Sequence, residues 1–206
     1  MATHQHATRI GLFEALPGDA RTRRIIGIVG FVLATTVGAY VAVPLPWTPV
    51  PMTLQPLFVI LAGALLGPWA GACSMAAYLA VGAAGAPVFS MGRSGLPWLM
   101  GLTGGYLIAY PAAAYLVGRV LHPHHEGGRV RHVGRPRAVL GLSLGIAVIY
   151  LGGVSQLAIL TGQDFGAVLA TGVIPFLAGD AVKVLIALVV VGLVQGGRAA
   201  DEGARR

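Results

Sequence analysis

The sequence predicts an all-α integral membrane protein with six transmembrane helices and both termini in the cytoplasm. Only 10% of the 206 residues are charged and 56% are hydrophobic, so polar residues are too few to cover a water-soluble surface. Several apolar segments approach the length that crosses a bilayer, and basic residues gather at alternate connections between them. We expect one membrane domain, residues 25–195, flanked by cytoplasmic segments 1–24 and 196–206.

The apolar segments define the expected spans. The first is the uncharged run 25–43, close to the roughly 20 residues that cross a bilayer core. The others cover residues 56–67, 69–85, 106–120, 139–161 and 166–194. Gly67-Pro68 marks a tight turn between the second and third spans. Residues 1–24 are polar and of mixed charge, with no short apolar core before a cleavage site, so we expect no removable signal peptide.

The basic residues set the orientation. If the N-terminus is cytoplasmic, all but two of the 14 basic residues lie on inner segments. The exceptions are Arg93 in an outer loop and Lys183 within the last span. This bias follows the positive-inside rule, and the net charge of +7 suits contact with anionic lipid headgroups. Nucleic-acid binding is not expected, because the basic residues are scattered and no soluble module organises them.

Asp180 and Lys183 are two ionisable residues in an otherwise apolar last span. A charge at membrane depth costs about 2.5–3.5 kcal/mol on insertion scales, so such residues face a cavity, a partner or each other. Their i,i+3 spacing places them on one helix face. One interpretation is an ion pair that locks this helix to its neighbours. The other is the polar floor of a ligand pocket, in which the ammonium receives a carboxylate and the aspartate accepts ligand N–H groups.

Two outer connections are rich in prolines, glycines and aromatic residues. Residues 44–56, PLPWTPVPMTLQP, contain five prolines and predict a stiff, extended cover that does not form a helix. Residues 85–106 mix aromatic residues and glycines with one arginine. Both segments are consistent with a lid over a cavity. Alternatively, they are interfacial belts in which Trp47 and Trp98 lie at the headgroups.

The remaining polar residues carry little signal. Cys73 is the only cysteine, and we expect it to pack within its span. His122, His124 and His125 form an HPHH sequence that we interpret as a solvated loop, not a metal site. The sequence has no nucleophile with its base, no paired carboxylates and no phosphate-binding glycine loop, so neither an enzyme nor a cofactor is expected.

Five sequence stretches carry a family resemblance when they are taken together and in order. They are PVPMTLQ (49–55), AGALLGPWAG (62–71), YLAVGAAGAPVF (78–89), GLTGGYLIAY (101–110) and PFLAGDAVK (175–183). With them, residues 25–194 resemble the BioY family, the biotin-specific substrate-binding (S) components of energy-coupling factor (ECF) transporters. The resemblance implies six transmembrane helices in a prokaryotic cell membrane and biotin bound near the outer face under the first loop. It also implies delivery with a transmembrane coupling subunit and cytoplasmic ATPases.

The resemblance also assigns residues to the site. It implies ligand binding by Asp180 and Lys183. It implies pocket lining by Thr103, Gly104, Gly105 and Tyr106, and lid contacts by Met52, Thr53 and Gln55. Lys183 is a positively charged donor and Asp180 a negatively charged acceptor. We therefore expect Lys183 to bind the biotin carboxylate and Asp180 to accept hydrogen bonds from the ureido N–H groups. Arg93 is the competing candidate for the carboxylate.

Small residues recur every four positions in the first span, at Gly30, Ala34, Gly38 and Ala42. They predict a smooth face on which another helix packs closely. The resemblance favours a coupling subunit there, and packing within the bundle is the alternative. Two other functions stay open: a component or carrier for another small acid, and a structural membrane protein in which Asp180 and Lys183 satisfy each other.

Overall fold

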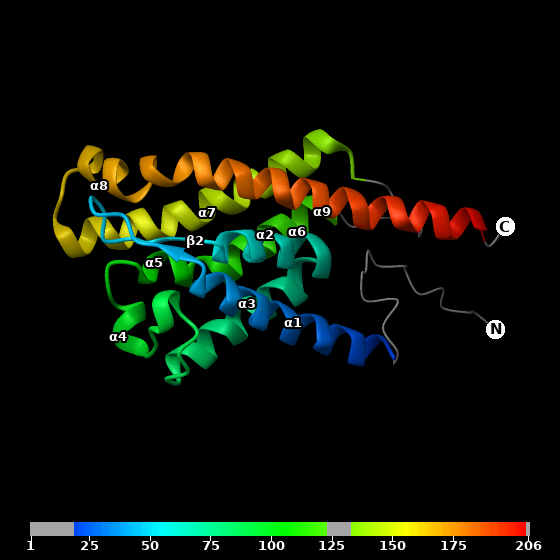
Figure 1. Cartoon of the computed structure of the whole chain (residues 1–206), viewed down its shortest axis with the longest axis horizontal. Coiled ribbons are helices and arrows are strands. Elements are labelled where there is room, and N and C mark those ends of the chain that lie inside the picture. The colour runs from blue at the N-terminus through cyan, green and yellow to red at the C-terminus, as the bar shows by residue number, and fades with distance from the viewer. Residues whose placement is uncertain (1–18, 123–132, 205–206) are drawn as a thin grey trace.

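Helices make up most of the chain in the computed structural model, which describes residues 19–122 and 133–204 (Figure 1). The elements follow in the order α1 (Ala20–Tyr40), β1 (Ala42–Val43), β2 (Met52–Thr53), α2 (Gln55–Leu66), α3 (Pro68–Ala83), η2 (Ser90–Gly92), α4 (Leu96–Leu99), α5 (Gly104–Ile108), α6 (Tyr110–Leu121), α7 (Arg135–Thr161), α8 (Phe165–Gly172), η3 (Ile174–Phe176) and α9 (Leu177–Ala204). His124 and His125 of the HPHH sequence lie outside the described residues.

Helix α1 begins five residues before the expected span and ends three before its expected end. Asp19 caps it, and the Asp19 Oδ1 atom accepts a hydrogen bond of 2.8 Å from the Thr22 N–H. Hydrogen bonds from Thr22 lower the pKa of the Asp19 carboxyl, because they stabilise its charged form. At the other end the chain leaves the helix after Tyr40 and enters β1.

The proline-rich segment connects the two strands of a β-hairpin and contains the second of them. Strands β1 and β2 pair antiparallel, with Ala42 opposite Thr53 and Val43 opposite Met52. Within the segment the strand is confined to Met52–Thr53, and helix α2 already begins at Gln55, so the expectation of an extended cover without helix holds for only part of it. Pro56 fits there because the first helical turn needs no backbone donor.

Two expected spans are interrupted helices, so their prediction as single segments is wrong. The segment 166–194 divides into α8, the short η3 and α9, with Pro175 in η3. The segment 106–120 divides at Ala109, and Pro111 lies in the first turn of α6. Proline lacks the N–H that would continue the preceding helix, and its ring clashes with the previous turn. Each break lies beside the pocket described below.

Small residues let the helices approach closely. A Cβ at Gly63 of α2 would collide with the Ala114 carbonyl oxygen of α6, and one at Gly118 of α6 would collide with the backbone of Pro68. Helix α6 contacts α2, α3 and α7 and lies at the centre of the bundle. Such contacts are typical of helix packing in membranes, where apolar side chains gain little by leaving lipid.

Gly38 does not share a face with Gly30. Gly38 is buried, and a Cβ there would lie 2.8 Å from the Phe58 ring, whereas a Cβ at Gly30 would have nothing within 4 Å. The reason is helical geometry: each step of four residues turns the position by about 40°, so the row winds around the helix. The interpretation of Gly38 as a partner contact is therefore wrong, because Gly38 already packs within the bundle.

The outward surfaces of the long helices are apolar. Leu33 of α1, Leu151 of α7 and Leu193 of α9 are all more than half exposed. Cys73 is exposed as well, contrary to the expected packing role. The sequence pattern misled here because lipid-facing and core-facing residues are both apolar.

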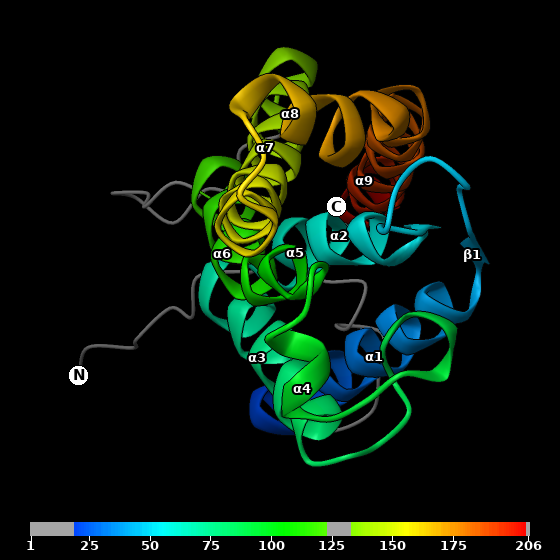
Figure 2. The same ribbon diagram turned by 90° about the vertical axis from the view of Figure 1, so that its left-hand side faces the viewer.

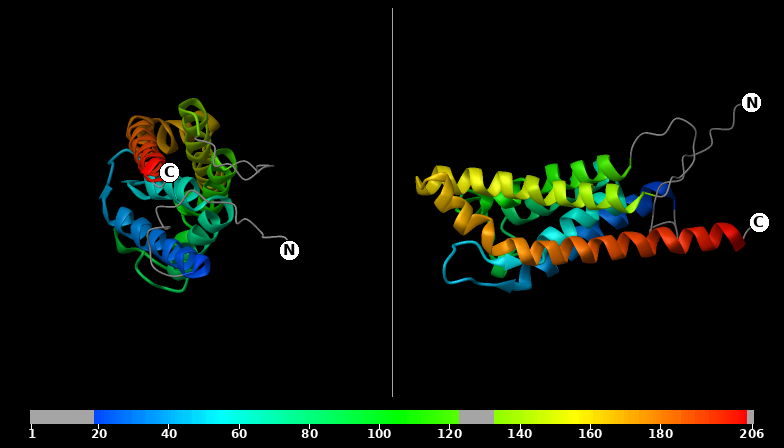
Figure 3. Two further views of the ribbon diagram at one scale, coloured as in Figure 1. Left: turned by 90° about the vertical axis from the view of Figure 1, so that its right-hand side faces the viewer. Right: turned by 90° about the horizontal axis from the view of Figure 1, so that it is seen from above.

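Three helical stretches among the described residues are long and apolar enough to cross a membrane: Ala20–Tyr40, Arg135–Thr161 and Phe165–Gln195. Helix α9 has 28 residues, or about 42 Å at 1.5 Å per residue, more than the roughly 30 Å of a bilayer core. It continues to Ala204, so the segment expected as a tail begins as helix. The start of α1 and the end of α9 lie at one end of the molecule, and the hairpin, α4 and α8 lie at the other (Figures 1 and 3).

Candidate functional site: a pocket under the hairpin

A pocket lies at the hairpin end of the bundle, which Figure 2 views end on. About 560 Å³ of empty space lies between its lining residues, and part of that space is open to the outside. Most of its walls are apolar or aromatic. They comprise Val50, Pro51, Met52, Pro56, Trp98, Tyr106, Leu107, Tyr110, Ile149 and Phe176.

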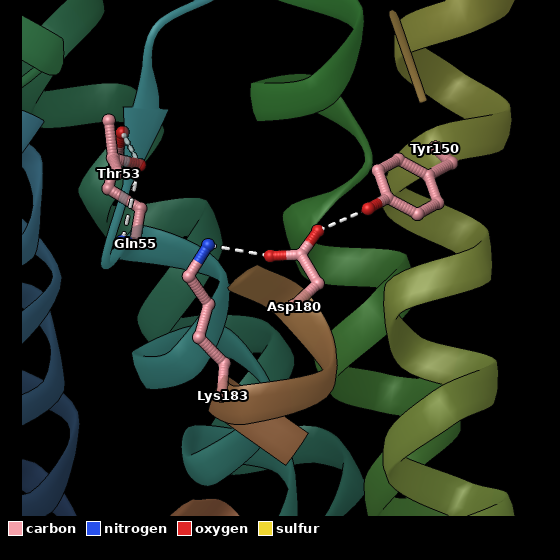
Figure 4. Close-up of polar contacts among 5 residues, drawn as sticks. All are labelled: Thr53, Gln55, Tyr150, Asp180 and Lys183. Atoms are coloured by element: carbon pink, nitrogen blue, oxygen red, sulfur yellow. Dashed lines mark hydrogen bonds and ion pairs between the residues drawn. The ribbon is translucent and has the colours of Figure 1, made fainter. Parts of the chain in front are cut away.

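Asp180 and Lys183 line this pocket together. Both are buried, with 6% and 5% of their surface exposed, and the Lys183 Nζ atom donates to Asp180 Oδ1 at 2.6 Å (Figure 4). Asp180 lies in the first turn of α9, so the break at η3 lets the charged pair begin a helix beside the pocket. The structure confirms that the two side chains share one face.

Tyr150 of α7 completes this polar group, and its hydroxyl donates to Asp180 Oδ2 (Figure 4). We call Tyr150, Asp180 and Lys183 the charged wall. Each carboxylate oxygen has one donor, and a carboxylate has about four acceptor sites, so about two remain for a ligand. The Lys183 ammonium likewise keeps donors beyond the one it gives to Asp180. The charged wall therefore presents a cationic donor directly beside an anionic acceptor.

Thr53 and Gln55 form a second polar surface, which we call the neutral wall. The Thr53 hydroxyl donates to Gln55 Oε1 at 3.0 Å (Figure 4). Gln55 Nε2 donates at 2.6 Å to the hydroxyl of Tyr78, behind the pocket. Both residues are buried and both line the pocket, and their contact with a ligand remains a prediction of the resemblance.

Two of the four predicted residues in 103–106 line the pocket, and two do not. Thr103 and Tyr106 are among the lining residues, and the Tyr106 hydroxyl donates to the Gly172 carbonyl at 2.8 Å, tying α5 to the end of α8. Gly104 and Gly105 are outside the described lining. Cβ atoms there would collide with the carbonyl oxygens of Leu99 and Gly152, so these glycines permit close backbone approach instead.

Arg93 lies at the edge of the pocket and not in its wall. It is exposed, and its guanidinium carbon lies 5.1 Å from the ring centre of Trp98, a lining residue. This distance is typical of a cation–π contact. Arg93 is therefore positioned at the rim, whereas Lys183 is inside.

Ser90 is a lining residue that the sequence did not single out. Its Oγ atom is buried and has no hydrogen-bond partner among the described residues. Buried hydroxyls are usually satisfied, so this atom is suited to a ligand or a water molecule. Tyr150 and Phe176 were also missed, because nothing separates them in the sequence from aromatic residues that face lipid. Trp98, whose segment the sequence left open between a lid and an interfacial belt, lines the pocket.

Comparison with solved structures identifies the fold. A crystal structure of the S-component for biotin from an ECF-type ABC transporter aligns with a TM-score of 0.77 at 23% identity, covering 88% of this chain and 95% of that one. The chain is thus a mostly helical, multi-pass membrane protein with the fold of a transporter S-component.

The sequence comparisons lead to the family. Residues 7–199 match the BioY family. A probable biotin transporter BioY of Pyrococcus horikoshii is 40% identical over 81% of this chain and 92% of its own length. The biotin transporter BioY of Rhodobacter capsulatus is 38% identical over 88% of each chain. This chain belongs to the BioY family.

Proposed function

We propose that this chain is the biotin-binding S component of an ECF-type transporter and captures biotin in the pocket under the hairpin. The observation that carries the proposal is the charged wall at the side of a mostly apolar, aromatic pocket. Biotin is an apolar bicycle with a ureido group at one end and a carboxylate on a flexible chain at the other. Such a ligand needs apolar walls and a few placed polar groups.

The ureido end of biotin suits the charged wall. Lys183 Nζ and Asp180 Oδ1 are 2.6 Å apart, so an extended biotin cannot place its carboxylate on one and its ureido group on the other. A cyclic urea presents a carbonyl acceptor beside an N–H donor, which complements the Lys183 donor beside the Asp180 acceptor. A ligand carboxylate there would lie against the Asp180 carboxylate. We therefore assign Lys183 to the carbonyl oxygen of the ureido group, in place of its expected assignment to the biotin carboxylate.

The carboxylate of biotin then belongs at the rim. Arg93 covers Trp98 there and provides a positive charge that remains in contact with solvent. The Ser90 hydroxyl, which has no hydrogen-bond partner in the part of the chain that the structure describes, is a neutral donor in the pocket lining. In this arrangement the apolar walls enclose the bicycle, and Met52, Thr53 and Gln55 hold it from the hairpin side.

The proposed topology has six spans within residues 25–195 and both termini in the cytoplasm of a prokaryotic cell. Arg21 and Arg24 lie near the start of α1, Arg119 lies in the last turn of α6, and α7 begins at Arg135. These helix ends lie at the end of the bundle away from the hairpin (Figure 1). This distribution supports a pocket that faces outward. A transmembrane coupling subunit and ATPases would supply the energy for import, and Gly30 with Ala34 remains the candidate contact for that subunit.

Equilibrium binding tests the proposed function. The purified protein, freed of bound ligand, is titrated with radiolabelled biotin, and other small acidic vitamins compete against it. Saturable binding that only biotin and its close analogues displace supports the proposal. Displacement by an unrelated acid would assign the pocket to that ligand. No saturable binding by folded protein would favour the structural interpretation, in which Asp180 and Lys183 only satisfy each other.

A further inference from the structure

The hydroxyl of Tyr78 joins the neutral wall to the backbone behind it. Tyr78 lies in α3, is fully buried and is outside the described pocket lining. Its hydroxyl accepts a hydrogen bond from Gln55 Nε2 at 2.6 Å and donates one to the Val88 carbonyl at 2.7 Å. One buried oxygen therefore contacts both a pocket residue and a fixed backbone acceptor.

The direction of these hydrogen bonds is determined by chemistry. The Val88 carbonyl can only accept, so the Tyr78 proton points to Val88 and the Tyr78 oxygen is left to accept. Gln55 must then present its amide nitrogen to Tyr78, and its Oε1 receives the Thr53 hydroxyl. An amide held on both sides cannot flip. The second N–H of Gln55 is consequently fixed as a donor, at a residue that lines the pocket.

The ring of Tyr78 is held independently of its hydroxyl. It packs edge-on against Phe89 with ring centres 5.7 Å apart, and it stacks on Tyr110 at 6.4 Å. Phenylalanine would keep both ring contacts and lose only the two hydrogen bonds. The hydroxyl can therefore be removed without creating a cavity the size of a side chain.

We infer that Tyr78 is a positioning residue for ligand binding, whose hydroxyl sets the orientation of the Gln55 amide toward the ligand. The inference rests on the proposed function, because biotin is the probe. Without the hydroxyl, Gln55 can exchange its donor and acceptor ends, and an acceptor can then face a ligand group that needs a donor.

The test compares Tyr78→Phe with Tyr115→Phe in binding of radiolabelled biotin. Tyr115 is a matched control on α6, since its ring packs on Trp69 at 5.0 Å and it is outside the described pocket lining. We expect Tyr78→Phe to weaken biotin binding about tenfold, the size of one hydrogen bond with an unsatisfied partner. Tyr115→Phe should stay within about twofold of the unchanged protein.

A second variant separates positioning from general stability. In a Gln55→Ala background there is no amide to orient, so adding Tyr78→Phe should change the biotin dissociation constant by less than about twofold. A tenfold effect that persists in this background would overturn the inference, and so would normal biotin binding by Tyr78→Phe, whatever its unfolding temperature. Failure of the unchanged protein to bind biotin would refute the proposed function instead.

Discussion

The charged wall and the neutral wall hold their polar groups by different means. Asp180 and Lys183 neutralise each other before any ligand arrives, and Tyr150 fixes the carboxylate from a second helix. Thr53 and Gln55 carry no charge and depend on a directed series of hydrogen bonds that ends at a backbone carbonyl. Damage to the charged wall leaves an unpaired buried charge, whereas damage to the neutral wall costs about one hydrogen bond. The two walls should therefore respond very differently to substitution.

The largest expected effect is on stability, when the ion pair is broken on one side. Lys183→Met and Asp180→Asn should each lower the free energy of unfolding by about 3–5 kcal/mol, because each leaves a buried group without its partner. The double change should recover part of the loss. Thermal unfolding of the ligand-free variants measures this, and strictly additive losses would show that the two residues do not stabilise each other.

The next effect is on affinity. Lys183→Met should cost about 2–5 kcal/mol of biotin binding, because a charged donor leaves a desolvated site. Biotin and a neutral biotin amide should lose the same amount, since we place the ureido group and not the carboxylate at Lys183. Arg93→Gln should weaken biotin more than the amide. Dissociation constants for both ligands across the folded variants decide this, and a selective loss of biotin in Lys183→Met would return the carboxylate to the charged wall.

Physical signals in the sequence located Asp180 and Lys183 of the charged wall, whereas Thr53 and Gln55 of the neutral wall were named only through the family resemblance. Asp180 and Lys183 stand out because ionisable residues are rare in apolar segments, and helical spacing placed them on one face. Tyr150 and Ser90 carry no such signal, because tyrosine and serine are ordinary in membrane helices and loops. Gly104 and Gly105 were assigned to the pocket by resemblance, yet their role is backbone contact. Only the three-dimensional arrangement separates lining residues from those that pack behind them.

The helices were predictable in position but not in continuity. Hydropathy located every long helix, since burial in lipid and burial in protein demand the same apolar side chains. The breaks at Ala109 and η3 lie within apolar runs, so hydropathy does not reveal them. The prolines Pro111 and Pro175 are the sequence signals of these breaks. Gly38 was misassigned because a repeat of four residues does not follow the helix period of 3.6.

A smaller effect is expected from the hairpin that covers the neutral wall. Val50 is buried, and Met52 lies over Gly179, where a Cβ would be 3.0 Å from its sulfur atom. Replacing residues 50–52 with glycines should accelerate biotin dissociation about tenfold, because Val50, Pro51 and Met52 all line the pocket and their apolar contact with the ligand is lost. Trp47→Gly is the control in the same loop, since Trp47 is 64% exposed. A chase with unlabelled biotin measures the rates, and an unchanged rate in the triple variant would make the hairpin an interfacial belt only.

The smallest effect on binding is expected outside both walls, on α1. A Cβ added at Gly30 would have no atom within 4 Å, so biotin binding by isolated Gly30→Leu should stay unchanged. If Gly30 and Ala34 contact the coupling subunit, the same change should abolish complex formation and uptake. Ala147→Leu, at an exposed position of α7, is the matched control. Normal complex formation by Gly30→Leu would remove this face from the partner interface.

Recognition of a cyclic urea by the charged wall is tested most directly by competition between ligands for the pocket of the unchanged protein. Labelled biotin is displaced either with desthiobiotin, which keeps the urea ring, or with lipoic acid, which keeps the carboxylated chain but has no urea. We predict displacement by desthiobiotin at concentrations close to those of unlabelled biotin, and little displacement by lipoic acid. Equal displacement by the two competitors would show that the pocket reads the carboxylated chain, and would contradict the assignment of Asp180 and Lys183 to the ureido group.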